Sequence, residues 1–171
     1  MKMYKRLAKK ISYSPNKRNR KDVKYIVIHY TAGANDTAKN EVDYFATNND
    51  RQAGAHFFVD REGKIGRSIP MNRTAWAVGG SKYPDTKGGK YYGKCTNFNS
   101  VSIELCAIAT RYPSEKQTKA VKKLIKYIHK HCKNIPQGNV IRHYDVTGKA
   151  CPSIYAKPNS KKWKEFKKAV S

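Results

Sequence analysis

The sequence has few acidic residues, few cysteines and no long apolar run. Its 12 aspartates and glutamates stand against 36 lysines and arginines, which gives a formal net charge of +24 over 171 residues. No segment approaches the roughly 18 consecutive apolar residues that a membrane-spanning helix needs. Four cysteines in a chain of this length do not form a dense disulfide pattern. These features exclude an integral membrane protein and a disulfide-stabilised scaffold, and we expect reduced thiols.

The N-terminal segment lacks the apolar centre of a secretory signal peptide. Residues 1–10 are rich in lysine and arginine, but no apolar stretch follows them. We therefore expect synthesis in a cytoplasm, so that any extracellular action needs another exit route. Residues 1–22 are basic and contain the turn signal Ser14-Pro15-Asn16-Lys17. We predict an N-terminal arm, residues 1–22, packed on a single domain of residues 23–171.

The composition is that of a folded domain with an excess of positive charge. A hydrophobic content of 39% and an aromatic content of 11% are enough for a core. A strongly positive field concentrates polyanions around the protein and speeds encounter with them. Nucleic acid, an anionic membrane surface and anionic polymers of a bacterial wall all fit this charge, and charge alone does not choose between them.

Hydrophobic periodicity predicts strands and helices in mixed order. Strands are predicted at residues 23–30, 55–60, 64–70, 74–78, 100–107 and 140–143. Helices are predicted at residues 37–48, after the capping box Ser114-Glu-Lys-Gln117, and from Ser160 onwards. Residues 79–93, rich in glycine, lysine and tyrosine, are predicted to form a long irregular loop. This order indicates an α/β (mixed) fold, with a central mixed sheet flanked by helices.

Two histidines and a cysteine form a candidate metal site. His29 lies near the end of an apolar strand, where its polar ring needs a partner. His143 follows a short predicted strand, and a glycine-containing loop leads from it to Cys151. Two imidazoles and a thiolate can hold one zinc ion, with the fourth position left for water as in catalytic zinc sites. Lys149, two residues before the cysteine, would place a positive charge beside the ion.

Glu104 is an acidic residue within an apolar strand. Buried near a zinc-bound water, its carboxylate would suit proton transfer. The alternation of Val101, Ile103 and Leu105 also permits Glu104 to face solvent beside Ser102. The local pattern alone leaves these two interpretations open.

The other histidines have simpler interpretations. His129 and His131 lie near Cys132 at the end of a lysine-rich helix, where a cation suits the helix dipole, so we do not expect a second metal site. His56 precedes two phenylalanines and is interpreted as lining a groove or supporting the site rather than as a metal ligand. The lysines of residues 119–130 form a solvated helix face by default, although a polyanion would balance their charge.

The sequence resembles the zinc-dependent N-acetylmuramoyl-L-alanine amidases of the type 2 class, which share a fold with peptidoglycan recognition proteins. The resemblance covers residues 23–152. It rests on five stretches in order: Ile26-Val-Ile-His-Tyr-Thr31, Ala55-His-Phe-Phe-Val-Asp60, Ala75-Trp76 with Gly79, Asn97-Phe-Asn-Ser-Val-Ser-Ile-Glu104, and His143 to Cys151-Pro152. Many bacteriophage endolysins look like this. The resemblance implies hydrolysis of the amide between N-acetylmuramic acid and L-alanine in bacterial peptidoglycan, leading to wall lysis.

The resemblance also implies roles for individual residues. His29, His143 and Cys151 fall on the three ligands of one Zn²⁺, and Glu104 on the catalytic carboxylate of several members. Lys149 falls on a position that is a catalytic lysine in some members and a threonine in others. Four further residues are predicted to contact substrate: Tyr30, His56, Trp76 and Asn99.

Three positions depart from the family pattern. Ala55 stands where some members carry a catalytic tyrosine, Ala77 where many carry a histidine, and Ser102 where a glycine is common. Because of Ala55, proton transfer would depend on Glu104. The expected partners are peptidoglycan and anionic wall polymers, with no nucleic acid, and we expect a monomer.

Two other functions remain as alternatives. A non-catalytic peptidoglycan-binding module on the same fold typically lacks a ligand, commonly the cysteine, whereas this chain has both Cys151 and Glu104. A nucleic-acid-binding protein is suggested by charge alone, but no helix-turn-helix or aromatic RNA-binding motif is present.

Overall fold

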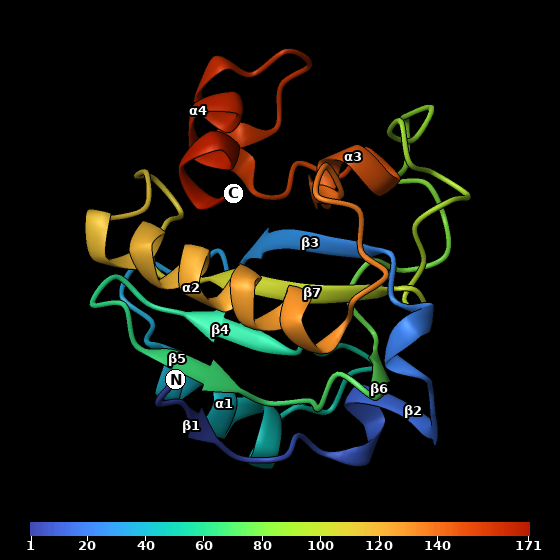
Figure 1. Ribbon diagram of the computed structural model, residues 1–171, viewed down its shortest axis with the longest axis vertical. Helices are drawn as coiled ribbons and strands as arrows, with labels where there is room; N and C mark the ends of the chain where they lie inside the picture. The colour runs from blue at the N-terminus through green and yellow to red at the C-terminus, as the bar shows by residue number, and fades with distance from the viewer.

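A computed structural model, which describes all residues 1–171, has a six-stranded mixed sheet at its centre (Figure 1). The strand order is β1-β5-β4-β7-β3-β8. The strands are β1 (Tyr4–Lys5), β3 (Tyr25–Tyr30), β4 (Phe57–Val59), β5 (Ile65–Arg67), β7 (Ser100–Leu105) and β8 (Val140–Arg142). β4, β7, β3 and β8 run parallel, whereas β5 is antiparallel to β4 and parallel to β1. The prediction of a mixed α/β fold with a central mixed sheet is confirmed.

One face of the sheet is closed by the long helix α2 (Glu115–His131), which crosses in front of the strands in Figure 1. Apolar residues of α2 recur at three- and four-residue spacing and are buried, as its amphipathic sequence predicts. They join Ile26, Ile28 and alternate residues of β4 and β7 in a cluster of 23 buried residues. The C-terminal helix α4 (Lys161–Val170) adds Trp163 and Phe166 to this cluster. This face therefore supplies most of the apolar core.

The opposite face is covered in two parts. Helix α1 (Ala38–Thr47) packs Ala38 and Val42 on Phe58 of β4. Gly66 of β5 allows this close approach, because a Cβ there would lie 2.6 Å from Val42. Beside α1, Val78 and Cys95 from loop segments pack with Val27 of β3 and Ile141 of β8. Because successive side chains of a strand alternate between faces, Val27 and His29 of β3 point to this side.

The N-terminal residues pack against the rest of the chain. β1 extends the sheet at β5, and β2 (Tyr13–Lys17) pairs with β6 (Arg73–Ala75) in a separate two-stranded sheet. Short 3-10 turns at Lys10–Ser12 and Arg20–Asp22 complete this segment. Ser12, Tyr13 and Arg18 are buried. A division of the chain at residue 22 stays a prediction.

The predicted elements lie where periodicity indicated them, and residues 79–93 contain no helix or strand, as expected. The capping box is only half formed. Ser114 Oγ accepts the N–H of Gln117, but the Gln117 amide donates to the carbonyls of Val59 and Cys106 instead of returning to Ser114. Gln117 thus ties α2 to the ends of β4 and β7. All four cysteines are free, and no helix has the length and apolar character to cross a membrane.

Candidate metal centre

Two neighbouring parallel strands bring the two histidines together. His29 is the fifth residue of β3, and His143 follows directly after β8. Since β3 and β8 are parallel and paired, their carboxyl ends lie side by side. The His143 N–H donates to the Ile28 carbonyl at 3.1 Å, which continues the pairing by one residue. The two imidazole centroids are 4.7 Å apart.

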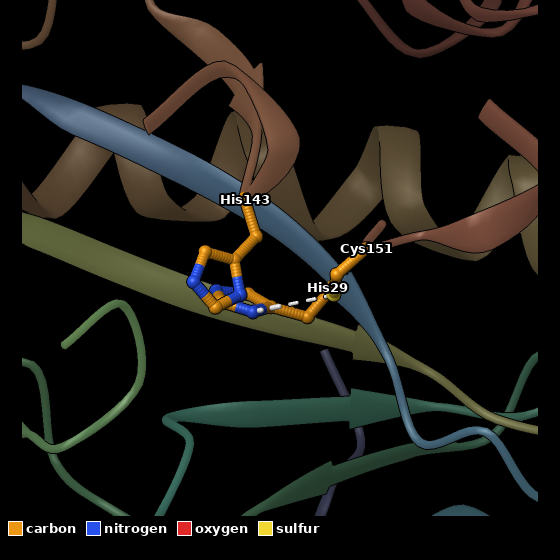
Figure 2. A group of neighbouring side chains, drawn as sticks. All are labelled: His29, His143 and Cys151. Atoms are coloured by element: carbon orange, nitrogen blue, oxygen red, sulfur yellow. Dashed lines mark hydrogen bonds between the residues drawn. The ribbon is translucent and has the colours of Figure 1, made fainter. Parts of the chain in front are cut away.

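The chain then turns back to deliver the cysteine. The short helix α3 (Tyr144–Thr147) ends at Gly148, whose φ of 84° lies in the left-handed region that favours glycine. The Tyr144 N–H donates to the Cys151 carbonyl at 2.9 Å, which closes this loop. As a result, Cys151 Sγ lies 3.8 Å from His29 Nδ1 (Figure 2). The ligand atoms of His29, His143 and Cys151 all lie within 4.8 Å of one another.

These three side chains suit a zinc ion. Burial lowers the pKa of His29 well below its usual value, helped by the positive field of His143 and Lys149. Burial, then Lys149, lowers the pKa of His143 to about 4. Both rings are therefore neutral at pH 7, which is the form that binds metals. His29 Nε2 is buried without a hydrogen-bond partner in the chain. Two imidazoles at the ends of β3 and β8, and one sulfur in the loop after α3, match the donor set of zinc sites.

The cysteine requires a compensating positive charge. Burial, followed by the negative field of Glu104, raises the pKa of the Cys151 thiol to about 12, while a hydrogen bond from the Tyr30 backbone and Lys149 oppose this rise. A buried thiolate is thus unfavourable by itself, and a bound divalent cation would lower the pKa of the thiol and so favour the thiolate.

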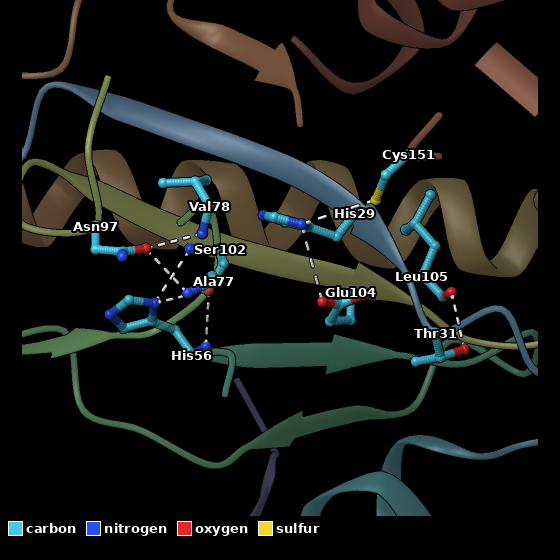
Figure 3. Close-up of polar contacts among 10 residues, drawn as sticks. All are labelled: His29, Thr31, His56, Ala77, Val78, Asn97, Ser102, Glu104, Leu105 and Cys151. Atoms are coloured by element: carbon cyan, nitrogen blue, oxygen red, sulfur yellow. Dashed lines mark hydrogen bonds and ion pairs between the residues drawn. The ribbon is translucent and has the colours of Figure 1, made fainter. Parts of the chain in front are cut away.

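Glu104 lies on the same face of the sheet as the candidate ligands. It is the cross-strand neighbour of His29 in the β3–β7 register, and its Oε1 lies 4.0 Å from His29 Nδ1 (Figure 3). Only 18% of its side chain is exposed, and Oε2 has no partner in the chain. Burial and the negative field of Glu41 raise the pKa of Glu104 to about 8, and Lys149 opposes this rise. Of the two interpretations left open by the sequence, the buried one is correct.

Lys149 is exposed and lies in the turn before Cys151. Its positive charge lowers the pKa of Glu104, of Cys151 and of both histidines. Lys149 is therefore the positive charge of the chain that acts on all four of these groups.

The four predicted substrate contacts stay predictions, and the structure shows where their side chains lie. His56 is 1% exposed, and its ring nitrogens lie 2.9 Å from Ser102 Oγ, 3.0 Å from Arg18 Nη2 and 3.1 Å from the Arg73 carbonyl. Tyr30 packs against the α2-side core, because it follows His29 and so points to the opposite face. Asn99 lies before the first residue of β7, five residues from Glu104, and holds the turn at Thr96. Trp76 is half-buried, and its substrate contact stays a prediction.

Three residues that support the site were not predicted from the sequence: Asp36, Arg18 and Asn97. Asp36 accepts hydrogen bonds from Thr31 Oγ1 and from the Ala107 N–H, and so ties the segments that follow β3 and β7. Arg18 donates to the carbonyls of Met71, Asn97 and Phe98. Asn97 belongs to a matched stretch, which was a usable signal. No sequence signal distinguished Arg18, because it is one of 36 basic residues.

No second group of three metal-binding side chains is present in residues 1–171. His131 Nδ1 lies 2.8 Å from the Tyr127 carbonyl, and Cys132 Sγ lies 4.0 Å from the sulfur of Met71. The absence of a metal site at the end of α2 stays a prediction.

Comparison with known proteins identifies a matching family and similar folds. The profile of the family Amidase_2, described as N-acetylmuramoyl-L-alanine amidase, matches residues 19–154. N-acetylmuramoyl-L-alanine amidase BlyA from Bacillus subtilis (strain 168) is 32% identical over 154 residues, which is 86% of this chain and 41% of BlyA. The chain thus spans about two fifths of that curated relative.

Solved structures extend the similarity to the whole chain. The structure of PlyL has a TM-score of 0.76 and 26% identity, covering 100% of this chain and 98% of PlyL. A mutant endolysin from Bacillus subtilis has a TM-score of 0.74 and 26% identity, covering 100% of this chain and 99% of that one.

Proposed function

Because the chain belongs to the N-acetylmuramoyl-L-alanine amidase family, we propose that it hydrolyses the amide between N-acetylmuramic acid and L-alanine in bacterial peptidoglycan. We propose further that it is the catalytic domain of an endolysin. One observation carries this proposal: His29, His143 and Cys151 converge within 4.8 Å, with the carboxylate of Glu104 beside them. A purely structural metal site would leave no role for that carboxylate.

The proposed cofactor is one zinc ion held by His29, His143 and Cys151. When bound, zinc supplies Lewis acidity toward water and toward the scissile carbonyl. The strands fix the two imidazoles before any metal arrives, so little reorganisation is needed. Three protein ligands would leave one coordination position of the ion for a further donor, as catalytic zinc sites require.

Glu104 is the proposed proton carrier. Its position beside His29 would put the carboxylate within reach of a water molecule at the centre, and only 18% of its side chain is exposed. The raised pKa allows Glu104 to hold a proton until the amine leaves, whereas the positive charge of Lys149 and of a bound cation would favour the ionised form that takes the proton up. We propose that Glu104 takes the proton of the attacking water and returns it to the leaving nitrogen of L-alanine.

Lys149 is proposed to stabilise the negative charge that develops on the carbonyl oxygen. Its ammonium group already influences all four buried groups of the centre. Such donors contribute about 3 kcal/mol when they act on the transition state. With Ala55 in place of a tyrosine, Glu104 and Lys149 are the side chains available for these two tasks.

We propose peptidoglycan and anionic wall polymers as partners, and a monomer as the active form. The net charge of +24 would hold the domain on an anionic wall. The basic face of α2 borders a groove of about 640 Å³, lined by Lys116, Lys119, Lys123 and Lys126, among others. A non-catalytic binding module on this fold is disfavoured by the presence of both Cys151 and Glu104.

The test uses purified bacterial walls and the protein loaded with one equivalent of zinc. New L-alanine amino termini without new reducing sugars would identify an amidase and exclude a glycosidase. We expect Glu104→Gln to lower the rate by about 10²–10⁴-fold, the range typical of proton-transfer groups. Glu165→Gln, on the exposed side of α4, is the control. An unchanged rate in Glu104→Gln, or reducing sugars as the product, would refute the proposal.

A further inference from the structure

The Arg142 side chain binds the start of the loop that carries two of the three candidate ligands, His143 and Cys151 (Figure 2). Arg142 is the last residue of β8 and lies directly before His143. Its Nε donates to Asp145 Oδ2 at 3.0 Å and its Nη2 to Asp145 Oδ1 at 2.5 Å, so both carboxylate oxygens are bound. The Arg142 backbone N–H also donates to Oδ2, at 2.9 Å. Because these bonds join the residue before His143 to the second residue after it, they fix the chain on both sides of that ligand.

The same guanidinium holds the segment that follows the loop. Its Nη1 donates to the carbonyl of Tyr155 and, at 3.0 Å, to that of Lys157. Both carbonyls lie beyond residues 19–154, which match the family profile. Tyr155 is 2% exposed and packs in the 23-residue core cluster, so its backbone is a firm attachment point. Arg142 therefore binds the chain near the start of residues 143–151 and again just beyond their end.

The surroundings of Arg142 match the shape of a guanidinium. The residue is 5% exposed, and its guanidinium carbon lies 4.8 Å from the ring centroid of Tyr144 and 5.5 Å from that of Trp163 in α4. Its planar fork of N–H donors binds a carboxylate through two parallel bonds, which the ammonium group of a lysine cannot reproduce. Asp145 supplies the compensating charge, with 18% of its side chain exposed. The contact needs both members, because either charge alone would be left without its partner in a poorly solvated site.

We propose that Arg142 is a positioning residue for the metal centre, which holds residues 143–151 in the conformation that brings the His143 imidazole and the Cys151 sulfur together. Regular structure in this loop is limited to the four residues of α3, so contacts with the rest of the chain help to fix its conformation. A loop that is already ordered binds a metal more tightly, because less conformational entropy is lost on binding. The inference rests on His143 and Cys151 being two of the proposed zinc ligands.

The experiment measures the zinc affinity of the purified, metal-stripped protein by competition with a chromophoric chelator. Arg142→Lys keeps the positive charge but loses the fork of donors. We expect about tenfold weaker binding, which is the cost of ordering the backbone of about one more residue when the metal binds. Asp145→Asn keeps the size of the side chain and should weaken binding to a similar extent. In the double variant the two losses should not add, because both substitutions break the same contact.

Arg73→Lys is the matched control. Arg73 also lies in a strand, donates to the carbonyl of Pro15, and has its guanidinium carbon 5.7 Å from the ring centroid of Tyr13. It makes no hydrogen bond to residues 143–151, so we expect wild-type zinc affinity in this variant. The visible absorption of the Co²⁺-loaded protein is a second measurement, because it reports the arrangement of donors around the ion. Arg142→Lys should change this absorption, and Arg73→Lys should not.

Three results would overturn the inference: wild-type zinc affinity or Co²⁺ absorption in Arg142→Lys, even with a lower Tm of the metal-free variant; an equal loss of affinity in Arg73→Lys; or additive losses in the double variant. If Arg142→Lys does not fold, as judged by circular dichroism, Asp145→Asn takes its place, since it leaves the guanidinium bonds to Tyr155 and Lys157 available. Both measurements are independent of catalysis. If wild type binds zinc without cleaving walls, the proposed function fails while this inference stands.

Discussion

Zinc should stabilise the fold in a way that depends on Cys151. The three candidate donors are already within 4.8 Å in the folded chain, and the unfolded chain has no such site. A ligand that binds only the folded state adds RT ln(1 + [L]/Kd) to the free energy of unfolding, about 2.7 kcal/mol at a hundredfold excess over Kd. For 171 residues the unfolding entropy is about 0.36 kcal/mol per kelvin. Zinc should therefore raise the Tm of the wild type by about 7 °C.

Cys151→Ala should remove most of this shift, because it takes away one of three donors. Cys132→Ala is the control, since Cys132 is also buried and free but lies at the end of α2. Without metal, both variants should lose about 1 kcal/mol from the smaller buried side chain. The assay is differential scanning calorimetry on metal-stripped protein, with and without added zinc. An equal zinc-induced shift in Cys151→Ala and wild type would refute the assignment of Cys151.

Three other outcomes test the charges around the centre. Lys149→Met should lower the rate of amino-terminus release by about 10²-fold. Lys157→Met, the control at an exposed lysine beyond Cys151, should leave that rate unchanged. Equal rates in the two variants would contradict a role for Lys149. Burial, then Asp36, raises the pKa of Glu41 to about 7, so ionisation of Glu41 costs folding free energy as pH rises from about 4.5 to 7. Because Glu41 is partly solvated, Glu41→Gln should have a free energy of unfolding only about 1 kcal/mol above that of wild type at pH 8, and equal to it at pH 4. Urea unfolding measures this difference. An equal gain in stability at both pH values would contradict the prediction. Binding of Glu104→Gln to walls should weaken as salt shortens the Debye length from about 10 Å at 0.1 M to about 3 Å at 1 M, and salt-independent retention would exclude charge as the main attraction.

Much of the fold could be predicted because its elements carry strong local patterns. The apolar run of β3 and the amphipathic spacing of α2 each indicate one structure without reference to the rest of the chain. β1 has two exposed residues, so no periodicity marks it, and its pairing with β5 is visible only in three dimensions. Gln117 shows a similar limit. Its position fits a capping box, but its amide donates instead to the carbonyls of Val59, at the end of β4, and of Cys106, just after β7.

The centre itself was predictable, and its surroundings were not. His29, His143, Cys151 and Glu104 each stand in a stretch that matches the family pattern, and that pattern is enough to assign them to one site. Tyr30 directly follows His29, so strand alternation alone places it on the other face of the sheet, where it packs against the main core cluster. The burial of His56 could not be foreseen, because its partner Arg18 comes from 38 residues upstream in a segment that reads only as basic.

The two faces of β3 explain why the sheet tolerates an unfavourable site. Ile26 and Ile28 face α2 and belong to the 23-residue cluster, while the alternate position His29 faces the centre. On that side His29 Nε2 and Glu104 Oε2 are buried without partners in the chain, and each such group costs about 1–3 kcal/mol. The apolar packing behind the sheet offsets this cost and keeps both side chains in place. The desolvation that destabilises the fold here also raises the pKa of Glu104 and keeps both imidazoles neutral. The chemistry of the centre and its cost in stability therefore have the same physical origin.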